Sequence, residues 1–189
     1  MEEDVSNAKL KQFQERIDSL ERQIDFLKNS RKDQLSVALV SGDLDKILAA
    51  MVISLAAAAQ DTKVKLFFSF WSLSALRDRR KRAKEKDLIS KIFGLILPGG
   101  KDKLRLSKLN MAGMGPLMIK WLMHKQGVLS LEQMFREAAD LGIEITICEM
   151  SMNLMGFKKE EMIDYPDLRF AGATTFVAEA NESSTQLFI

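Results

Sequence analysis

The chain has 189 residues, of which 47% are hydrophobic and 29% are charged, a balance typical of a folded globular protein and not of a disordered one. The net charge of +2 gives no reason to expect a nucleic-acid partner. The chain has one cysteine, Cys148, and one histidine, His124. An intrachain disulfide is therefore excluded, and a closed zinc site within one chain is not expected. We predict neither a bound metal nor a cofactor.

No sequence signal points to secretion or to a membrane. The N-terminal residues are charged and lack the apolar core of a secretory signal. The longest apolar stretch, 47–59, is interrupted by Ser54 and is too short to cross a bilayer, so it suits a buried core helix. We expect a cytoplasmic protein without a membrane span.

The first 33 residues carry a narrow apolar seam. Its members recur at alternating spacings of three and four, which is the pattern of a coiled coil. They are Leu10, Phe13, Ile17, Leu20, Ile24 and Leu27. We predict an N-terminal coiled-coil helix over residues 1–33, which assembles copies of the chain into a homo-oligomer. The alternative is that the seam packs on the chain's own globular body.

The remaining chain, 34–189, alternates strands and helices. A short apolar run at 34–40 is followed by an Ala-rich helix at 44–60 and a second strand at 63–68, which is the βαβ pattern of a parallel sheet. Ser130 and Gln133 form a capping box for a later helix that ends before Gly142. The following elements are a strand at 143–148, helices at 152–156 and 159–163, a strand at 168–170, a helix at 173–181 and a strand at 185–189. We predict a flavodoxin-like α/β domain with a parallel sheet of four to five strands.

Two segments are less easily assigned. Residues 88–128 are rich in Met and Gly and form an insertion, either a lid, a packing surface or a purely structural element. The run from Arg77 to Lys86 is strongly basic. We interpret it as the solvated face of a helix, with contact to RNA, an acidic partner or an anion as the alternative.

Ligands of open α/β sheets bind at the carboxyl ends of the strands. Three predicted turns lie there: 41–43, 69–72 and 148–151. Cys148 ends a strand and Ser151 begins a helix, whose N-terminus favours the reactive thiolate, although Glu149 opposes it. The spacing is C-x-x-S, so the thiol has no resolving partner, but it can hold a persulfide or a mixed disulfide. The alternative is that Cys148 is a small buried hydrophobic residue.

Four stretches in order along the chain resemble the DsrE/DsrF-like family, in particular its longer branch of sulfur-transfer proteins. They are 40–46 (VSGDLDK), 67–71 (FFSFW), 106–115 (LSKLNMAGMG) and 148–156 (CEMSMNLMG). The resemblance implies a flavodoxin-like, oligomeric fold in which a cysteine near a strand end carries a persulfide. Cys148 would be that residue, and a small sulfur-carrier or thiol protein would be its partner. The N-terminal helix is not part of the family core.

The leading hypothesis is a sulfurtransferase-like carrier that relays sulfane sulfur on Cys148. The residues predicted to shape its pocket come from the turns and the insertion: Gly42, Asp43, Phe70, Trp71, Ser151, Met111 and Met114. Two alternatives stay open. One is a non-catalytic oligomeric scaffold or small-ligand-binding module. The other is a soft-metal binder using Cys148 with Met150, Met152 and Met155. Whether the protein is an enzyme is left open.

Overall fold

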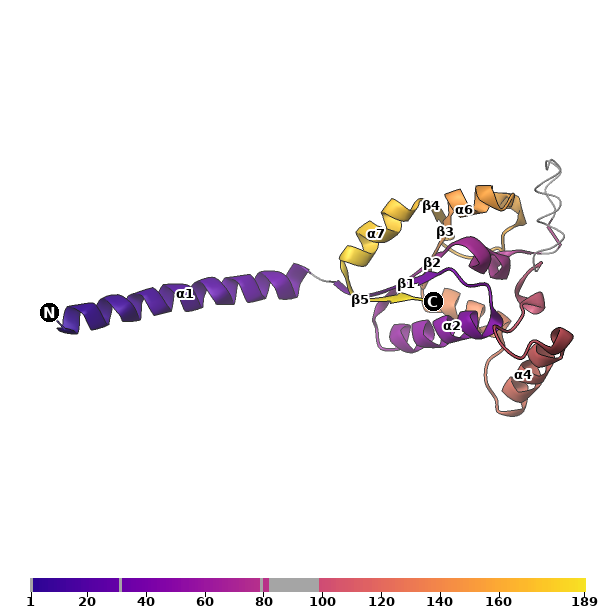
Figure 1. Ribbon diagram of the computed structural model, residues 1–189, viewed down its shortest axis with the longest axis horizontal. Coiled ribbons are helices and arrows are strands. Elements are labelled where there is room, and N and C mark those ends of the chain that lie inside the picture. Colours follow the sequence, from indigo (N-terminus) through magenta and orange to yellow (C-terminus); the bar gives the residue numbers. More distant parts are fainter. Residues whose placement is uncertain (1, 31, 79, 82–98) are drawn as a thin grey trace. The chain divides into compact units, whose positions relative to one another are not determined.

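The computed structural model describes residues 2–30, 32–78, 80–81 and 99–189 (Figure 1). The chain divides into two compact units, Met1–Lys32 and Asp33–Ile189, which are described separately. No helix among the described residues is long and apolar enough to span a membrane.

The first unit contains one helix, α1 (Glu2–Ser30). A helix was predicted here from the seam, and Phe13, Ile17, Leu20 and Ile24 all have exposed side chains. These four members of the apolar stripe are thus exposed on the helix. The coiled coil itself stays a prediction.

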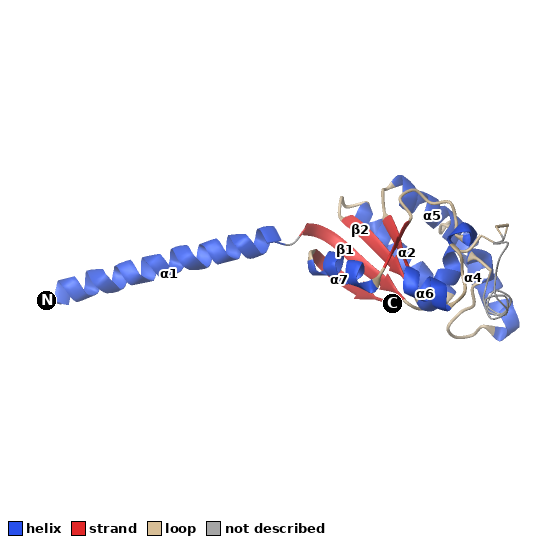
Figure 2. Cartoon of the chain, turned by 90° about the horizontal axis from the view of Figure 1, so that it is seen from above, coloured by secondary structure: helices blue, strands red, loops and turns tan. Residues whose placement is uncertain are grey.

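The second unit is an α/β domain around a five-stranded parallel sheet (Figure 2). The strand order is β4-β3-β2-β1-β5. The strands are β1 (Lys32–Leu39), β2 (Lys63–Phe68), β3 (Glu144–Cys148), β4 (Arg169–Ala171) and β5 (Ser183–Phe188). The predicted α/β fold class and the parallel sheet are confirmed, with strand ends shifted by one or two residues.

Helices cover both faces of this sheet. In Figure 1, α7 (Ala173–Asn181) lies over one face and α2 (Leu44–Ala58) lies under the other. α2 packs against α5 (Leu131–Asp140), whose predicted capping box between Ser130 and Gln133 is formed. The remaining described helices are α4 (Met114–Lys125), α6 (Glu149–Leu154) and the short 3-10 helices Phe70–Leu76, Lys101–Lys103, Met111–Gly113 and Lys159–Glu161.

The pleat of the strands divides the core between the two faces. Successive side chains of a strand point to opposite faces, so Ile147 joins the large cluster beneath the sheet and Cys148 joins a smaller cluster under α7. Phe67 belongs to the same small cluster, where its ring stacks on Phe176 at 5.1 Å between centroids. The register of β3 therefore decides which face the thiol occupies.

A 3-10 helix follows β2 and ends at Leu76, where Arg77 turns extended and forms an isolated bridge with Met162. Most of the basic helix predicted after it lies outside the described residues. Two other local predictions were wrong in detail. The same bridge shortens the helix predicted at 159–163 to one 3-10 turn. The helix predicted at 152–156 begins at Glu149, directly after β3.

The structure describes only part of the basic run and of the insertion. Residues 79 and 82–86 of the run and 88–98 of the insertion lie outside the described residues. Arg77, the first residue of the run, does not lie on a solvated face. Its side chain is mostly buried, with its guanidinium 4.5 Å above the Phe157 ring and 3.7 Å from a Glu161 carboxylate oxygen.

Gly42 lies where the β1–α2 turn meets the chain after β2. A Cβ atom at this position would lie 2.4 Å from the Trp71 carbonyl oxygen, far inside the normal contact distance. Substituting Gly42→Ala should lower the free energy of unfolding by about 1–3 kcal/mol, because the two turns must separate. Urea unfolding measures this.

Gly172→Ala is the matched control, since its nearest neighbour would be the Thr174 hydroxyl at an ordinary 3.7 Å. Equal stability of the two variants would contradict the close contact at Gly42.

Candidate functional site

The turns that follow β1, β2 and β3 meet at the carboxyl edge of the sheet. The Ser69 amide donates to the Leu39 carbonyl at 2.9 Å, and the Ser72 amide donates to the Val40 carbonyl at 3.2 Å. The contact of Gly42 with Trp71 adds to these bonds. Of the predicted pocket residues, Gly42, Asp43, Phe70, Trp71 and Ser151 thus come from adjoining turns at one edge.

Cys148 lies at the junction of β3 and α6. It is the last residue of the strand and occupies the N-cap position of the helix. Only 1% of its surface is exposed, and it packs with Ala38, Phe67, Phe176 and Ala180. The surroundings of the thiol are therefore apolar on the side of α7.

A pair of serines supplies the polar side of the thiol's surroundings. The parallel register pairs Phe68 with Ile147, so the next residues, Ser69 and Cys148, leave the sheet at the same level. The Ser69 hydroxyl lies 2.8 Å from the Ser151 hydroxyl, and both side chains are buried. The pair joins the end of β2 to the first turn of α6.

Burial raises the pKa of the Cys148 thiol, but the hydroxyl and amide of Ser151, the hydroxyl of Ser69 and the amide of Met150 lower it, and the net pKa lies below the usual value. The side chain forms no N-cap hydrogen bond. Because a thiolate is a far better acceptor than a thiol, these donors favour the deprotonated form.

Each serine hydroxyl carries a single proton, which limits how the pair can act. When one hydroxyl donates to the other, only the second is left to donate to the sulfur. The thiolate is then stabilised by one hydroxyl and by backbone amides at the start of α6. Ser151 was predicted to begin this helix, but Cys148 takes the N-cap position and Ser151 lies within the first turn. Its part in stabilising the thiolate stays a prediction, and Ser69 was not singled out by the sequence.

Phe70 and Trp71 follow Ser69 on the adjoining turn. Phe70 has a left-handed backbone, with φ of 49°, a conformation that is strained for an aromatic residue and often found at functional sites. Trp71 is 52% exposed. In the β1 turn, the Ser41 hydroxyl donates to the Asp43 carboxylate at 2.9 Å, so this carboxylate is held within its own turn.

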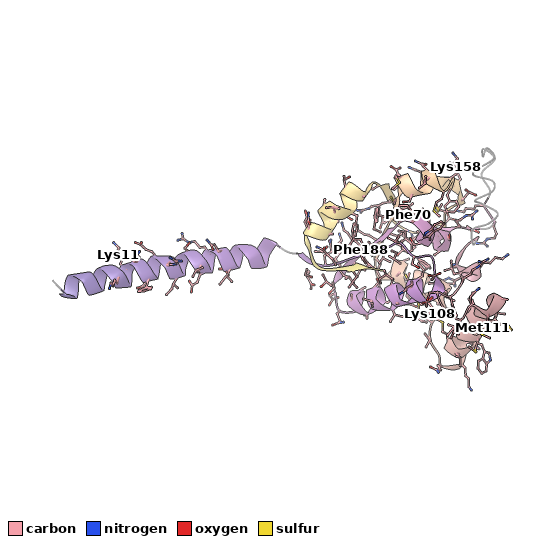
Figure 3. The ribbon with its side chains drawn as sticks, in the orientation of Figure 1. Lys11, Phe70, Lys108, Met111, Lys158 and Phe188 are labelled. Atoms are coloured by element: carbon pink, nitrogen blue, oxygen red, sulfur yellow. The ribbon has the colours of Figure 1, made fainter. Side chains whose placement is uncertain are left out.

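The structure does not bring the two methionines of the insertion to Cys148 within one chain. Met111 and Met114 both have exposed side chains, and Met111 lies well apart from Phe70 (Figure 3). The structure of a single chain therefore does not support the prediction that Met111 and Met114 line the pocket. The insertion segment packs instead at the start of α2, where the Ser107 hydroxyl donates to Asp45 at 2.6 Å.

The methionines near Cys148 are also separated from it. Met152 and Met155 are buried in the large cluster, Cys148 belongs to the small one, and Met150 is exposed. This arrangement does not form the predicted soft-metal site. Among the described residues, no group of three or more His, Cys, Asp or Glu side chains could hold a metal ion.

The sequence model of the DsrE/DsrF/DrsH-like family matches residues 31–188 of the chain. The protein belongs to this family. Among curated family relatives, it is 42% identical over 154 residues to the uncharacterized protein YrkE of Bacillus subtilis, covering 82% of this chain and 95% of YrkE. It is 30% identical over 160 residues to the sulfur carrier protein DsrE2 of Allochromatium vinosum, covering 82% of this chain and 98% of DsrE2.

Among solved structures, the chain is similar to the ychN protein from E. coli, with a TM-score of 0.47 and 9% identity, covering 82% of this chain and 99% of that one. α1 lies outside the segment that matches the family model.

Replacing Ser151 with Ala should raise the pKa of Cys148, because a hydroxyl and its dipole are lost from the thiolate's surroundings. In the wild-type protein the rate of thiol alkylation should rise with pH and reach half its plateau at a lower pH than that of a free cysteine. In Ser151→Ala this midpoint should move to higher pH, and Ser69→Ala should move it in the same direction. Alkylation by iodoacetamide, followed by intact-mass spectrometry, measures the profile.

Asn153→Ala, an exposed substitution on the same helix, is the control and should leave the midpoint unchanged. A wild-type midpoint at or above that of free cysteine, or serine variants that match the control, would contradict the role of the serine pair.

Proposed function

We propose that this protein is a sulfur carrier in which Cys148 accepts sulfane sulfur as a persulfide and passes it to a thiol of a partner protein. Membership of the family and the similarity to the sulfur carrier DsrE2 support a sulfur-relay role in general. One observation supports the persulfide on Cys148 in particular. The thiol lies beside Ser69 and Ser151, and its pKa is lowered although the side chain is buried.

Loading is a sulfur transfer without net oxidation. The Cys148 thiolate attacks the outer sulfur of a donor persulfide, R–S–SH, and forms a new S–S bond. The donor's own S–S bond breaks, its electron pair leaves with the donor as R–S⁻, and Cys148 becomes Cys–S–SH. The proton stays on the transferred sulfur, so atoms and charge balance.

Unloading reverses these roles. A thiolate of the acceptor attacks the outer sulfur of the persulfide, the bond to the Cys148 sulfur breaks, and Cys148 leaves as a thiolate. A thiol with a lowered pKa is a better leaving group. The donors that lower the pKa of Cys148 therefore assist the second transfer as well as the first.

The burial of Cys148 limits what reaches it. With 1% of its surface exposed, the thiol reacts only when the surrounding residues move. Trp71 and Met150 are exposed and lie in the turns that follow β2 and β3, three and two residues after the strand ends. We place donor and acceptor entry at these turns. The apolar cluster with Phe67 and Phe176 on the other side would shield the persulfide from water and oxidants.

After incubation with an inorganic polysulfide, the wild-type protein should gain one sulfur atom at Cys148. Because this is the only cysteine, intact-mass spectrometry reports the site without digestion. A reductant should remove the added mass, and Cys148→Ser should gain none.

Ser151→Ala should load at least several-fold more slowly than wild type near neutral pH, where fewer of its Cys148 side chains are deprotonated. A wild-type protein that stays unmodified, or a Cys148→Ser variant that gains the same mass, would rule the proposal out.

A specific observation favours a second candidate function, that of a binding module. The insertion exposes large apolar side chains over α4, the 3-10 helix Met111–Gly113 and the residues just before it, which marks a surface for protein contact. They are Leu109, Met111, Met114, Leu117, Met118 and Trp121. If binding were the whole function, Cys148 would not react with small thiol reagents under native conditions, and a protein partner would bind Cys148→Ser as tightly as wild type.

A further inference from the structure

The apolar seam of α1 divides cleanly into the two core positions of a heptad. Leu10, Ile17 and Ile24 take position a, while Phe13, Leu20 and Leu27 take position d. Phe13 is 66% exposed, and Ile17, Leu20 and Ile24 are each about half exposed. Most of the stability of a helix in a protein comes from packing of its amphipathic face, so we expect this stripe to pack on a second helix.

We infer that α1 pairs with α1 of a second copy of this chain as a parallel, in-register, two-stranded coiled coil. The core residues of the seam indicate the number of strands in the coiled coil. Isoleucine at position a with leucine at position d favours two strands in parallel coiled coils. The second and third heptads follow this pattern, with Ile17 and Ile24 at position a and Leu20 and Leu27 at position d, while the first holds Leu10 and Phe13.

The charged residues beside the seam indicate that the two helices run parallel. Arg16 takes position g and Glu21 takes position e of the next heptad, and both are exposed. In a parallel pair, position g of one helix faces this position e of the other. Arg16 of each copy then meets Glu21 of the other copy, which gives two symmetric ion pairs.

An antiparallel pair would lose these contacts. There, g positions face g positions and e positions face e positions. With the whole seam overlapped, Arg16 would meet only Gln23 or Arg16 of the other copy, and neither is acidic. In the same overlap, Glu21 would face only Gln14 or Glu21. The charge pattern therefore selects the parallel arrangement.

This interaction is separate from the sulfur chemistry. α1 lies outside the residues that match the family model, 31–188. It is an addition that assembles copies of a family domain, and the inference holds or fails independently of what Cys148 does.

Charge reversal in the full chain tests the pairing. Arg16→Glu should raise the dissociation constant of the dimer about tenfold, because two attractive pairs become repulsive. Glu21→Arg should do the same, and the double variant Arg16→Glu/Glu21→Arg should recover wild-type association. An equimolar mixture of the two single variants should form heterodimers. Sedimentation equilibrium over a range of protein concentrations measures these constants.

Arg22→Glu is the matched control, since Arg22 takes position f, on the outside of the coil. It changes the charge equally but should leave the dissociation constant unchanged. A double variant that fails to recover association, or an effect of Arg22→Glu as large as that of Arg16→Glu, would overturn the ion pairs.

Cross-linking tests the orientation. In a Cys148→Ser background, Leu20→Cys should form an interchain disulfide when treated with oxidised glutathione, because the two position-20 side chains meet in a parallel pair. Asp18→Cys, on the outer position b, should not. An antiparallel pair would instead cross-link only a mixture of Leu20→Cys and Ile17→Cys, whose positions then meet. That outcome, or no cross-link in any variant, would overturn the inference.

Discussion

The hydrogen bond between the hydroxyls of Ser69 and Ser151 joins the end of β2 to the first turn of α6, with the thiol of Cys148 beside it. The bond depends on the parallel register of β2 and β3, which brings Ser69 level with Cys148. It depends equally on α6 beginning directly after β3. A register shift by one residue would turn the side chain of Cys148 to the other face of the sheet and separate it from both serines.

The same geometry explains how the thiol of Cys148 can be both buried and reactive. Burial alone would hold Cys148 protonated and inert. The hydroxyls and the amides at the start of α6 outweigh that effect, and the pKa falls below its usual value. The thiol thus combines an apolar shield under α7 with a polar side at the carboxyl edge. A carrier needs both properties, since it must hold a labile sulfur and also release it.

The fold was largely predictable because its signals are local. The capping box of Ser130 and Gln133 and the helix over Ala173–Asn181 were found from the sequence, as was Cys148 at a strand end. The Ser69–Ser151 pair could not be found in this way, because the two residues are far apart in the chain and meet only through the register of the sheet. Ser69 does follow the last residue of a strand, which was the one available signal.

The position of the insertion could not be predicted from the sequence either. Its glycines and methionines permit several packings, and nothing in their spacing shows which edge of the sheet they reach. The contact between Ser107 and Asp45 fixes the segment at the start of α2, and Met111 and Met114 face outwards. A second copy or a partner protein would therefore be needed to bring other side chains over these methionines.

A pulse–chase experiment with isotopically labelled sulfane sulfur tests most directly whether Cys148 relays sulfur. The protein is loaded with labelled persulfide, freed of donor, and mixed with an acceptor protein that carries one reactive thiol. The label should leave Cys148 and appear on the acceptor as a persulfide, with the carrier restored to its free thiol. Label that stays on Cys148, or that is lost as sulfide without reaching the acceptor, would contradict the relay.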